Sequence, residues 1–203
     1  MLAARISDDI RSGVLAPGAW LKQVDLEAKY DAKRITVRHA LVRLTQDRLV
    51  QHFPNRGYRV YQIDGRQFRE LRQIRTRLEL MASETMMDNV DDSACDELEA
   101  LAEQFLEVTQ SGTGMDQIKV NRSFHARFMQ LSSNRELAHV ILEMRQRTPS
   151  ALTHRWRTHE QVKRRAEIHF EIVGALRKRD LEKLQSMIRE QEKIVLSGLE
   201  DYL

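Results

Sequence analysis

Asn121 and His125 lie four residues apart in a segment, residues 116–132, whose apolar pattern predicts a helix. Four residues is about one helical turn, so both side chains project from the same face of that helix. Phe124 and Phe128 flank the pair and place it near a hydrophobic core. Polar groups that face a core cost free energy unless they are hydrogen-bonded or bind a ligand. The pair is therefore a candidate binding site, and ordinary packing is the alternative.

Two further polar residues are expected to approach this pair from the last two predicted helices, residues 162–178 and 181–202. His169 lies eleven residues before Asp180, and Gln191 lies eleven residues after it. If the chain turns at Asp180, both side chains lie at the same height on neighbouring antiparallel helices. His169 shares its face with apolar residues and should point inward. The polar residues expected to converge are Asn121, His125, His169 and Gln191.

Long helices account for the rest of this second segment. An apolar stripe along residues 66–89 predicts the first of them, and further helices are expected after Asp92 and Asn134. Pro149 should interrupt the last of these, and His154 should be solvated. The segment shows about six helices and no strand pattern, which predicts an antiparallel helical bundle. The stripe on the first helix consists of Phe68, Leu71, Ile74, Leu78 and Met81.

The first 60 residues follow a different pattern, with short elements joined by glycine and proline turns. Apolar spacing predicts three helices followed by a hairpin. Their ranges are 2–11, 23–30 and 34–47 for the helices and 49–53 and 58–61 for the strands. This order predicts a winged helix-turn-helix, in which the third helix enters the major groove of DNA and the hairpin forms the wing. The expected fold class is mainly α: this domain with its small β-hairpin wing, then the all-α antiparallel bundle.

Basic residues gather where such a domain would contact DNA. Residues 1–60 carry 11 Lys/Arg and 6 Asp/Glu, whereas the rest of the chain carries 22 and 24. Arginine suits guanine edges and phosphates, and a helix N-terminus attracts phosphate. The alternative is a solvated basic face. The candidate contacts are Lys33, Arg34, Thr36 and Arg38 at the start of the third helix, and Arg56 and Gly57 at the wing tip.

Composition fits a soluble protein of the cytoplasm. The chain has 203 residues, of which 41% are hydrophobic and 31% are charged, enough for one large or two small domains. Asp8 and Asp9 stand where a signal peptide would be apolar, and no apolar run approaches about 18 residues. Cys95 is the single cysteine, which fits a reducing compartment.

The first segment resembles the DNA-binding domain of the GntR family of bacterial transcription regulators. The shared features are I-x3-I-x-x-G-x-L-x-P-G, the stretch LKQVDLEA, V-R-x-A-L-x-x-L and R-G-Y-x-V of the wing. The resemblance implies DNA contacts from Arg34, Thr36, Arg38 and Gly57. The serine that usually caps the recognition helix is absent, and Asp31 is expected to take that role.

The second segment resembles the FCD ligand-binding domain of the FadR subfamily. The motifs are R-x-x-L-E from Arg75, N-x-x-F-H from Asn121, and H-x-x-I-V-x-A-L-x3-D from His169. The resemblance implies that Arg75 contacts an effector carboxylate. Many FCD domains bind a divalent metal through Asp or Asn and three histidines. Here the matching set is Asn121, His125, His169 and Gln191, so glutamine replaces one histidine. Zinc or a similar ion, a metal-free pocket for an organic anion and plain packing all remain open.

The resulting prediction is a ligand-responsive transcription regulator, more often a repressor than an activator in this family. Residues 1–62 would bind a palindromic DNA operator, and residues 66–203 would bind a small organic acid and form a homodimer. One alternative is a constitutive DNA-binding dimer with a purely structural bundle. A metal-dependent enzyme is a remote alternative, because no acidic residue adjoins either histidine in an H-E-x-x-H pattern. The protein is therefore predicted not to be an enzyme.

Overall fold

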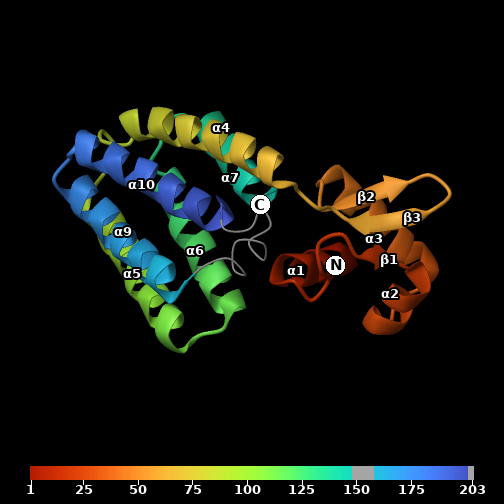
Figure 1. Ribbon diagram of the computed structural model, residues 1–203. Helices are drawn as coiled ribbons and strands as arrows, with labels where there is room; N and C mark the ends of the chain where they lie inside the picture. Colours follow the sequence, from red (N-terminus) through yellow and green to blue (C-terminus); the bar gives the residue numbers. More distant parts are fainter. Residues whose placement is uncertain (148–157, 201–203) are drawn as a thin grey trace. The chain divides into compact units, whose positions relative to one another are not determined.

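The computed structural model describes residues 1–147 and 158–200, and Figure 1 shows their helices and strands. These residues form two compact units that separate between Asp64 and Gly65. Pro149 and His154 lie outside the described residues, as do residues 201–203 at the end of the predicted second domain. Each unit is described by itself.

The first unit has three helices and a small sheet. The elements are α1 (Leu2–Ser12), β1 (Trp20–Leu21), α2 (Gln23–Tyr30), α3 (Arg34–Gln46), β2 (Val50–Phe53) and β3 (Gly57–Val60). The predicted order of three helices and a hairpin is confirmed. Strand β1 was not predicted: it pairs with β3 and gives an antiparallel sheet of order β1-β3-β2. A strand of two residues has no periodicity, so the sequence pattern could not reveal it.

An apolar core fixes the three helices of this unit against one another. It includes Ile6 and Ile10 of α1, Leu26 of α2, and Val37 and Leu41 of α3. These side chains recur at helical spacing, so each helix turns one face inward and leaves the opposite face to solvent. For α3, this arrangement leaves the face that carries Arg34 and Arg38 exposed to solvent.

The ends of two helices differ from the sequence-based expectations. Asp31 lies at the C-terminal end of α2 with a left-handed φ of 49°, and it does not cap α3. Lys33 occupies the N-cap position of α3 without a side-chain cap. An Asp side chain tolerates the left-handed region and so can end a helix there. Helix α5 is capped by Asp91, whose side chain accepts a hydrogen bond from the Ala94 amide, one residue earlier than expected.

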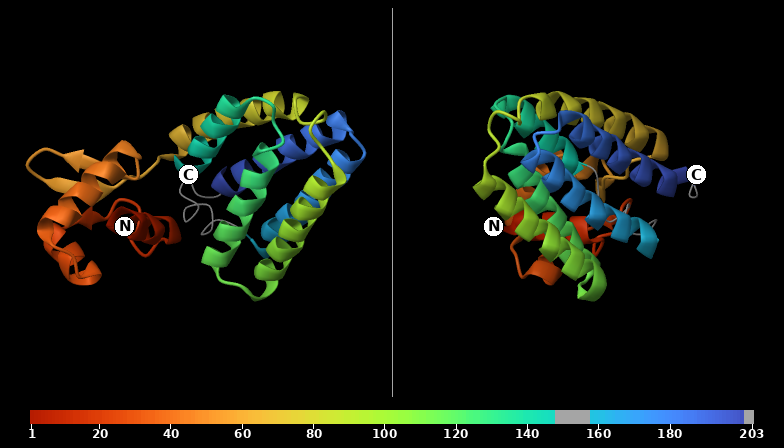
Figure 2. Two further views of the ribbon diagram at one scale, coloured as in Figure 1. Left: turned by 180° about the vertical axis from the view of Figure 1, so that it is seen from behind. Right: turned by 90° about the vertical axis from the view of Figure 1, so that its left-hand side faces the viewer.

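The second unit consists, in its described part, of helices without a strand. They are α4 (Gly65–Glu84), α5 (Asp92–Ser111), α6 (Gly114–Met129), α7 (Arg135–Arg147), α9 (His159–Arg177) and α10 (Leu181–Glu200). Helix α5 packs against α6 and α9, and α10 packs against α4 and α9, as Figure 2 shows from two sides. The turn predicted near Asp180 is present: Arg179 has a φ of 52°, and the Asp180 carboxylate accepts a hydrogen bond from the Lys183 amide. The predicted helical bundle is confirmed.

Helix α4 differs in part from the expectation, because only the first residue of its predicted apolar stripe, Phe68, is fully buried. Ile74 and Met81 are 52% and 53% exposed, and Leu71 and Leu78 are only half-buried. Five of the eight buried residues of α4 are instead polar: Arg72, Arg75, Thr76, Glu79 and Ser83. The helix thus buries an unusual number of polar groups and leaves two large apolar side chains, Ile74 and Met81, exposed.

Candidate DNA interface and effector site

The exposed face of α3 carries the residues predicted to contact DNA. Lys33, Arg34, Thr36 and Arg38 are all exposed at the N-terminal end of the helix, whereas Val37 is fully buried. Arg34 and Arg38 lie one turn apart, so both guanidinium groups can reach toward the same groove. The structure thus brings these predicted contacts to one solvent-exposed helix end.

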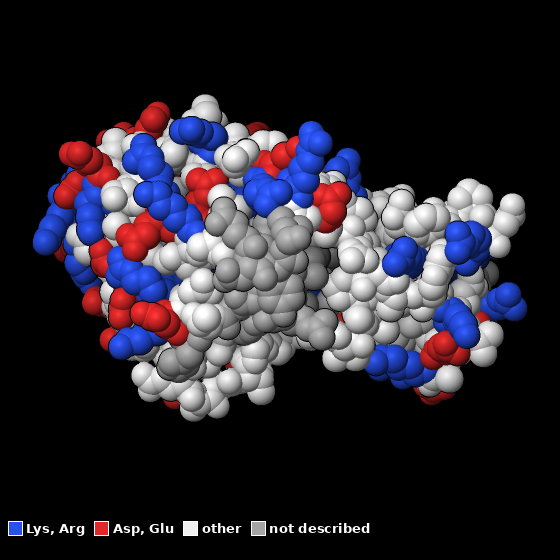
Figure 3. Space-filling view, viewed as in Figure 1, with Lys and Arg blue, Asp and Glu red and all other residues white. Residues whose placement is uncertain are grey.

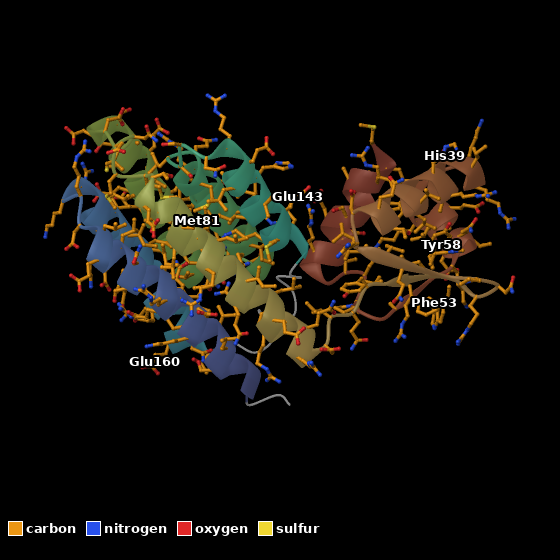
Figure 4. The ribbon with its side chains drawn as sticks, turned by 90° about the horizontal axis from the view of Figure 1, so that it is seen from above. His39, Phe53, Tyr58, Met81, Glu143 and Glu160 are labelled. Carbon is orange, nitrogen blue, oxygen red and sulfur yellow. The ribbon has the colours of Figure 1, made fainter. Side chains whose placement is uncertain are left out.

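Three exposed side chains on the same helix were missed by the sequence analysis. Ile35 and Val42 are 64% and 45% exposed, and His39, labelled in Figure 4, lies between them in the chain. Exposed apolar groups on a recognition helix can contact the thymine methyl group. The signal was available, because Ile35 and Val42 fall outside the spacing of the buried residues.

The wing places Arg56 in the turn between β2 and β3. Asn55 and Gly57 on either side have left-handed φ values of 61° and 95°, which favour asparagine and glycine. The Arg56 guanidinium carbon lies 5.1 Å from the ring centroid of Trp20. Figure 3 shows that basic side chains predominate over acidic ones on the visible face of the first unit, whereas both charges mix on the second. This distribution suits a polyanionic partner of the first unit.

The predicted polar residues of the second unit do gather inside the bundle. His125 of α6 is 2% exposed, His169 of α9 is fully buried, and Gln191 of α10 is 6% exposed. The imidazole centroids of His125 and His169 lie 5.4 Å apart with their planes nearly perpendicular. Asn121 is only half-buried and lies one turn before His125. The two histidines therefore meet inside the bundle, as expected for polar residues that face its interior.

His169 lies among aromatic rings. Its ring stacks on that of Phe124 at a centroid distance of 4.0 Å and an angle of 13°, and the Phe105 centroid lies 4.9 Å away. Within the described part of the chain, neither ring nitrogen of His169 has a hydrogen-bond partner, and Nδ1 of His125 has none either. Leaving a buried polar group unpaired costs about 1–3 kcal/mol. Such groups are expected where a ligand binds.

Three arginines that the sequence analysis did not select surround these residues. Arg72 donates from Nη2 to the Gln191 carbonyl oxygen at 3.2 Å, and Arg165 donates from Nη2 to Asn121 Oδ1 at 3.1 Å. Arg145 of α7 approaches Glu79 Oε1 to 2.7 Å. Arg72 lies three residues before Arg75 and Arg165 four before His169, so helical spacing could have revealed both. We define the buried polar cluster as Arg72, Arg75, Glu79, Asn121, His125, Arg145, Arg165, His169 and Gln191.

Arg75, the predicted carboxylate partner, already contacts a carboxylate in the cluster. Its Nε lies 3.4 Å from Glu79 Oε1, and both side chains are about 5% exposed. Arg75 and Glu79 lie one turn apart on α4 and form a buried ion pair, not a surface one. Glu79 thus interacts with two guanidinium groups, those of Arg75 and Arg145. Burial of charges on this scale is tolerated only with such pairing.

Burial and the neighbouring positive charges keep both histidines neutral. Burial, with a smaller contribution from Arg145, lowers the pKa of His169 to about 3. Burial lowers the pKa of His125 well below 6.5, and the charges of Arg145, His169 and Arg72 lower it further. Burial also lowers the pKa of Arg72 to about 10, which leaves it charged at neutral pH. The cluster therefore combines two neutral imidazoles with several cationic side chains.

The donor set fits a divalent metal poorly. The residues that the resemblance assigns to the metal include two imidazoles and two neutral amides, and Asn121 Oδ1 already accepts a hydrogen bond from Arg165. Zinc and similar ions favour imidazole, thiolate and carboxylate ligands. Over the ranges 1–147 and 158–200, no group of three His, Cys, Asp or Glu side chains is arranged to hold a metal. The metal site is an untested prediction, and these residues fit an anion better.

The fold and the cluster define a class of protein: a winged helix-turn-helix module followed by an all-helical domain with a polar interior. Residues 1–60 match the family described as bacterial regulatory proteins, gntR family, and residues 70–191 match the FCD domain. The chain belongs to the FCD-containing regulators of the GntR family, as the sequence motifs predicted. The relatives named for this family are transcription regulators and not enzymes.

Similar proteins include regulators from several bacteria. McbR of Escherichia coli K12 is 28% identical over 147 residues, covering 70% of this chain and 66% of McbR. YdhC of Bacillus subtilis 168 is 26% identical, covering 65% and 59%. The chain thus spans less than two thirds of these two relatives. The repressor RspR of E. coli K12 is 26% identical and covers 85% of this chain and 75% of RspR.

Solved structures share the fold across the whole chain. E. coli McbR/YncC superposes with a TM-score of 0.83 at 24% identity and covers 98% of this chain and 95% of its own. A GntR regulator from Rhodococcus sp. RHA1 gives a TM-score of 0.81 at 22% identity, with coverages of 100% and 97%. In addition, none of the helices in the described ranges has the length and apolarity needed to cross a membrane.

Proposed function

We propose that this protein is a cytoplasmic transcription regulator whose helical domain binds a small organic acid and thereby changes operator binding. The observation that carries the proposal is the buried polar cluster, whose unpaired histidine nitrogens lie inside a domain that follows a DNA-binding module. A purely structural bundle would bury apolar groups there, since unpaired polar groups are destabilising. The family and the relative named as a repressor favour repression.

The outward apolar residues of α4 support a homodimer. Ile74 and Met81 lie seven residues apart on one face of α4, and Val140 of the neighbouring α7 is 42% exposed. Figure 4 shows α4 with Met81 beside α7 with Glu143, and the ion pair between Arg145 and Glu79 joins the two helices. Exposed apolar groups gathered on adjacent helices are typical of an interface between subunits. A two-fold dimer would suit a palindromic operator.

Met81→Glu is expected to weaken this dimer by about tenfold or more, because a carboxylate would be buried against apolar groups of the partner. Sedimentation velocity over a range of micromolar concentrations measures the dissociation constant. Val24→Glu is the matched control, because Val24 is 68% exposed on α2 of the first unit. Equal dimerisation of wild type and Met81→Glu would exclude this face as the interface.

Helix α4 offers a direct route from effector to DNA. Its buried face carries Arg72, Arg75 and Glu79, and its exposed face carries Ile74 and Met81. The helix begins only five residues after β3 of the wing. An effector that draws on Arg72 and Arg75 would shift α4 and with it the arrangement of the two dimer halves. Binding can change the equilibrium only by its differential affinity for the two arrangements.

Operator binding in the presence of small organic acids tests the proposal. A duplex selected from random sequence by the wild-type protein serves as operator, and fluorescence anisotropy measures its affinity with and without each acid. We expect at least one acid to change the affinity by about 5-fold to 150-fold. If no acid changed the affinity or the thermal midpoint, the alternative of a constitutive DNA-binding dimer would be preferred.

A further inference from the structure

Guanidinium groups occupy the surroundings in which the family resemblance places a metal. Of the four predicted metal ligands, Asn121 accepts a hydrogen bond from Arg165, and the main chain of Gln191 accepts one from Arg72. Arg145 Nη2 lies 2.7 Å from Glu79 Oε1, and the Arg145 charge acts on both imidazoles. A divalent cation placed among these residues would be repelled by several fixed positive charges.

The unpaired atoms of the cluster are mostly hydrogen-bond donors. Within residues 1–147 and 158–200, the Nε atoms of Arg72, Arg145 and Arg165 and the Nε2 atom of Gln191 have no acceptor. An arginine Nε–H can only donate, and a neutral imidazole offers one donor and one acceptor. The one carboxylate of the cluster, Glu79, is already shared by Arg75 and Arg145. Glu79 Oε1 also lacks a hydrogen bond, but donors outnumber acceptors among these atoms, so a partner that supplies acceptors and negative charge fits the cluster.

We infer that the effector site of this protein works without a metal, and that Arg145, with Arg72, supplies the positive charge that binds the carboxylate of a small organic acid. This inference rests on the proposed function, since it specifies how the same site recognises its effector. Arginine donates two parallel hydrogen bonds to a carboxylate and is suited to this role even when buried. His125 and Gln191 can then bond the remaining oxygens of the acid.

The position of Arg145 relative to the histidines supports its central role. Among neighbouring charges, that of Arg145 contributes to the lowered pKa of both His125 and His169. The negative charges of Glu79 and of Glu192 on α10 partly offset the lowering of the Arg72 pKa by burial. In the free protein, Glu79 forms ion pairs with Arg75 and Arg145. An incoming carboxylate would compete with Glu79 for Arg145 rather than bind an unscreened charge.

The first test uses the wild-type full-length protein and needs no variant. Protein purified without chelator is analysed for metals, and thermal midpoints are measured with citrate, succinate, acetate or inorganic phosphate, each with EDTA and with added Zn²⁺ or Ni²⁺. We expect fewer than about 0.1 metal ions per chain and a rise in midpoint with citrate or succinate that EDTA does not remove. Stabilisation that requires Zn²⁺ or Ni²⁺ would overturn the inference but leave the proposed function standing.

Two further outcomes have separate meanings. If no carboxylic acid stabilised the protein with or without metal, the proposed effector function and this inference would both fail. Equal stabilisation by phosphate and by carboxylic acids would indicate unspecific anion binding and would overturn the assignment of a carboxylate ligand.

Variants then assign the charge to Arg145. Arg145→Gln is expected to lower citrate or succinate affinity by about tenfold or more, whereas Arg145→Lys, which keeps the charge but not the planar fork, should lower it less. Arg177→Gln is the control, because Arg177 also contacts carboxylates, those of Asp96 and Glu99, but on the surface. Unchanged affinity in a folded Arg145→Gln protein would exclude Arg145 as the anchor.

Trp20 lies on strand β1 of the wing sheet, and its side chain is 40% exposed. Its ring lies 5.1 Å from the guanidinium carbon of Arg56, 5.9 Å from that of Arg59 and 5.3 Å from the ring centroid of Phe53. Arg59 is also fixed by a hydrogen bond from its Nε to the Gly18 carbonyl oxygen at 2.5 Å. Arg56 lies in the turn and is exposed, so the indole contact is what restrains its guanidinium.

We propose that Trp20 is a positioning residue for DNA binding: it holds Arg56 of the wing in an orientation that reaches the DNA backbone. Restraining a long side chain before binding lowers the entropy that association must remove. Trp20 itself would act through Arg56 and not by reading a base. The unpredicted strand β1 is what brings Trp20 to the wing, because its pairing partner is Arg59.

A double-mutant cycle tests this role. Arg56→Ala and Trp20→Ala are each expected to weaken operator binding by about 2-fold to 10-fold. The double variant should lose no more affinity than the single variant that has the larger loss. Trp20→Tyr should restore part of the affinity, since tyrosine also stacks on a cation. Losses that multiply in the double variant would show that Trp20 acts independently of Arg56 and would overturn the proposal.

Discussion

Replacing Arg38 by alanine should reduce operator affinity by at least about tenfold per protomer bound, which corresponds to roughly 1–3 kcal/mol. Arg38 is exposed one turn after Arg34 at the N-terminal end of α3, and the opposite face of that helix is anchored in the core by Val37 and Leu41. Alanine keeps the helix and removes the guanidinium, so the loss should be one of contact and not of folding.

Two measurements separate the possible roles of Arg38. Anisotropy titrations at several salt concentrations give the slope of affinity against salt, which should fall by about one if Arg38 contacts a phosphate. A preserved slope with weaker discrimination between base pairs would indicate contact with a base edge. Arg127→Ala is the control, since Arg127 pairs with Glu97 on the helical domain. If both affinity and salt slope were unchanged in Arg38→Ala, α3 would not be the recognition helix.

Replacing His169 by phenylalanine should stabilise the protein while abolishing its response to the effector. The fully buried imidazole stacks on Phe124 and lies near Phe105, so a phenyl ring can keep both contacts. It would also remove two buried nitrogens that lack partners in the described part of the chain. Relief of about 1–3 kcal/mol would raise the thermal midpoint by roughly 2–12 °C. Loss of function with a gain in stability is typical of a binding site.

The pH dependence of stability provides a second readout for the same variant. The pKa of His169 is lowered to about 3 in the folded protein from 6.5, so only the unfolded chain binds this proton between those values. Stability should therefore fall as the pH decreases from 6.5, by up to about 1.4 kcal/mol per pH unit for this residue. Denaturant unfolding should show a shallower decrease for His169→Phe.

A control separates this effect from histidine replacement in general. His139→Phe should leave both the midpoint and the pH slope nearly unchanged, because His139 is exposed on α7 beside Glu143. A lower midpoint for His169→Phe would show that the ring nitrogens make stabilising bonds in the free protein, and would argue against a ligand site at His169.

The effector site illustrates where sequence reasoning stops. Helical spacing correctly predicted that His125 and His169 each face the interior, because a helix fixes which residues share a face. It could not reveal Arg145, which reaches the cluster from α7 and has no spacing relation to either histidine. The family pattern drew attention to four ligand positions, whereas the structure surrounds them with arginines. The proposal of an anion site in place of a metal site depends on these neighbours.

Helix α4 shows the same limit in another form. Its apolar spacing correctly predicted a helix, since periodicity depends only on the order of residues. The expected burial of the stripe was wrong for Ile74 and Met81, because the pattern alone assumes that apolar groups face the interior. Here the interior near α4 holds a polar cluster, and the apolar side is left for the proposed partner subunit.

The sequence by itself determined the two-part organisation, the winged helix-turn-helix, the helical bundle and the family. These features follow from local periodicity, turn residues and short motifs, which act within one element or between neighbours along the chain. Only the tertiary structure decided that α4 buries Arg72, Arg75 and Glu79, that β1 brings Trp20 to the wing, and that Arg145 and Arg165 join the polar residues of the bundle interior. Charges from separate helices act on one another through space, and their combined effect on a site appears only when the helices are packed.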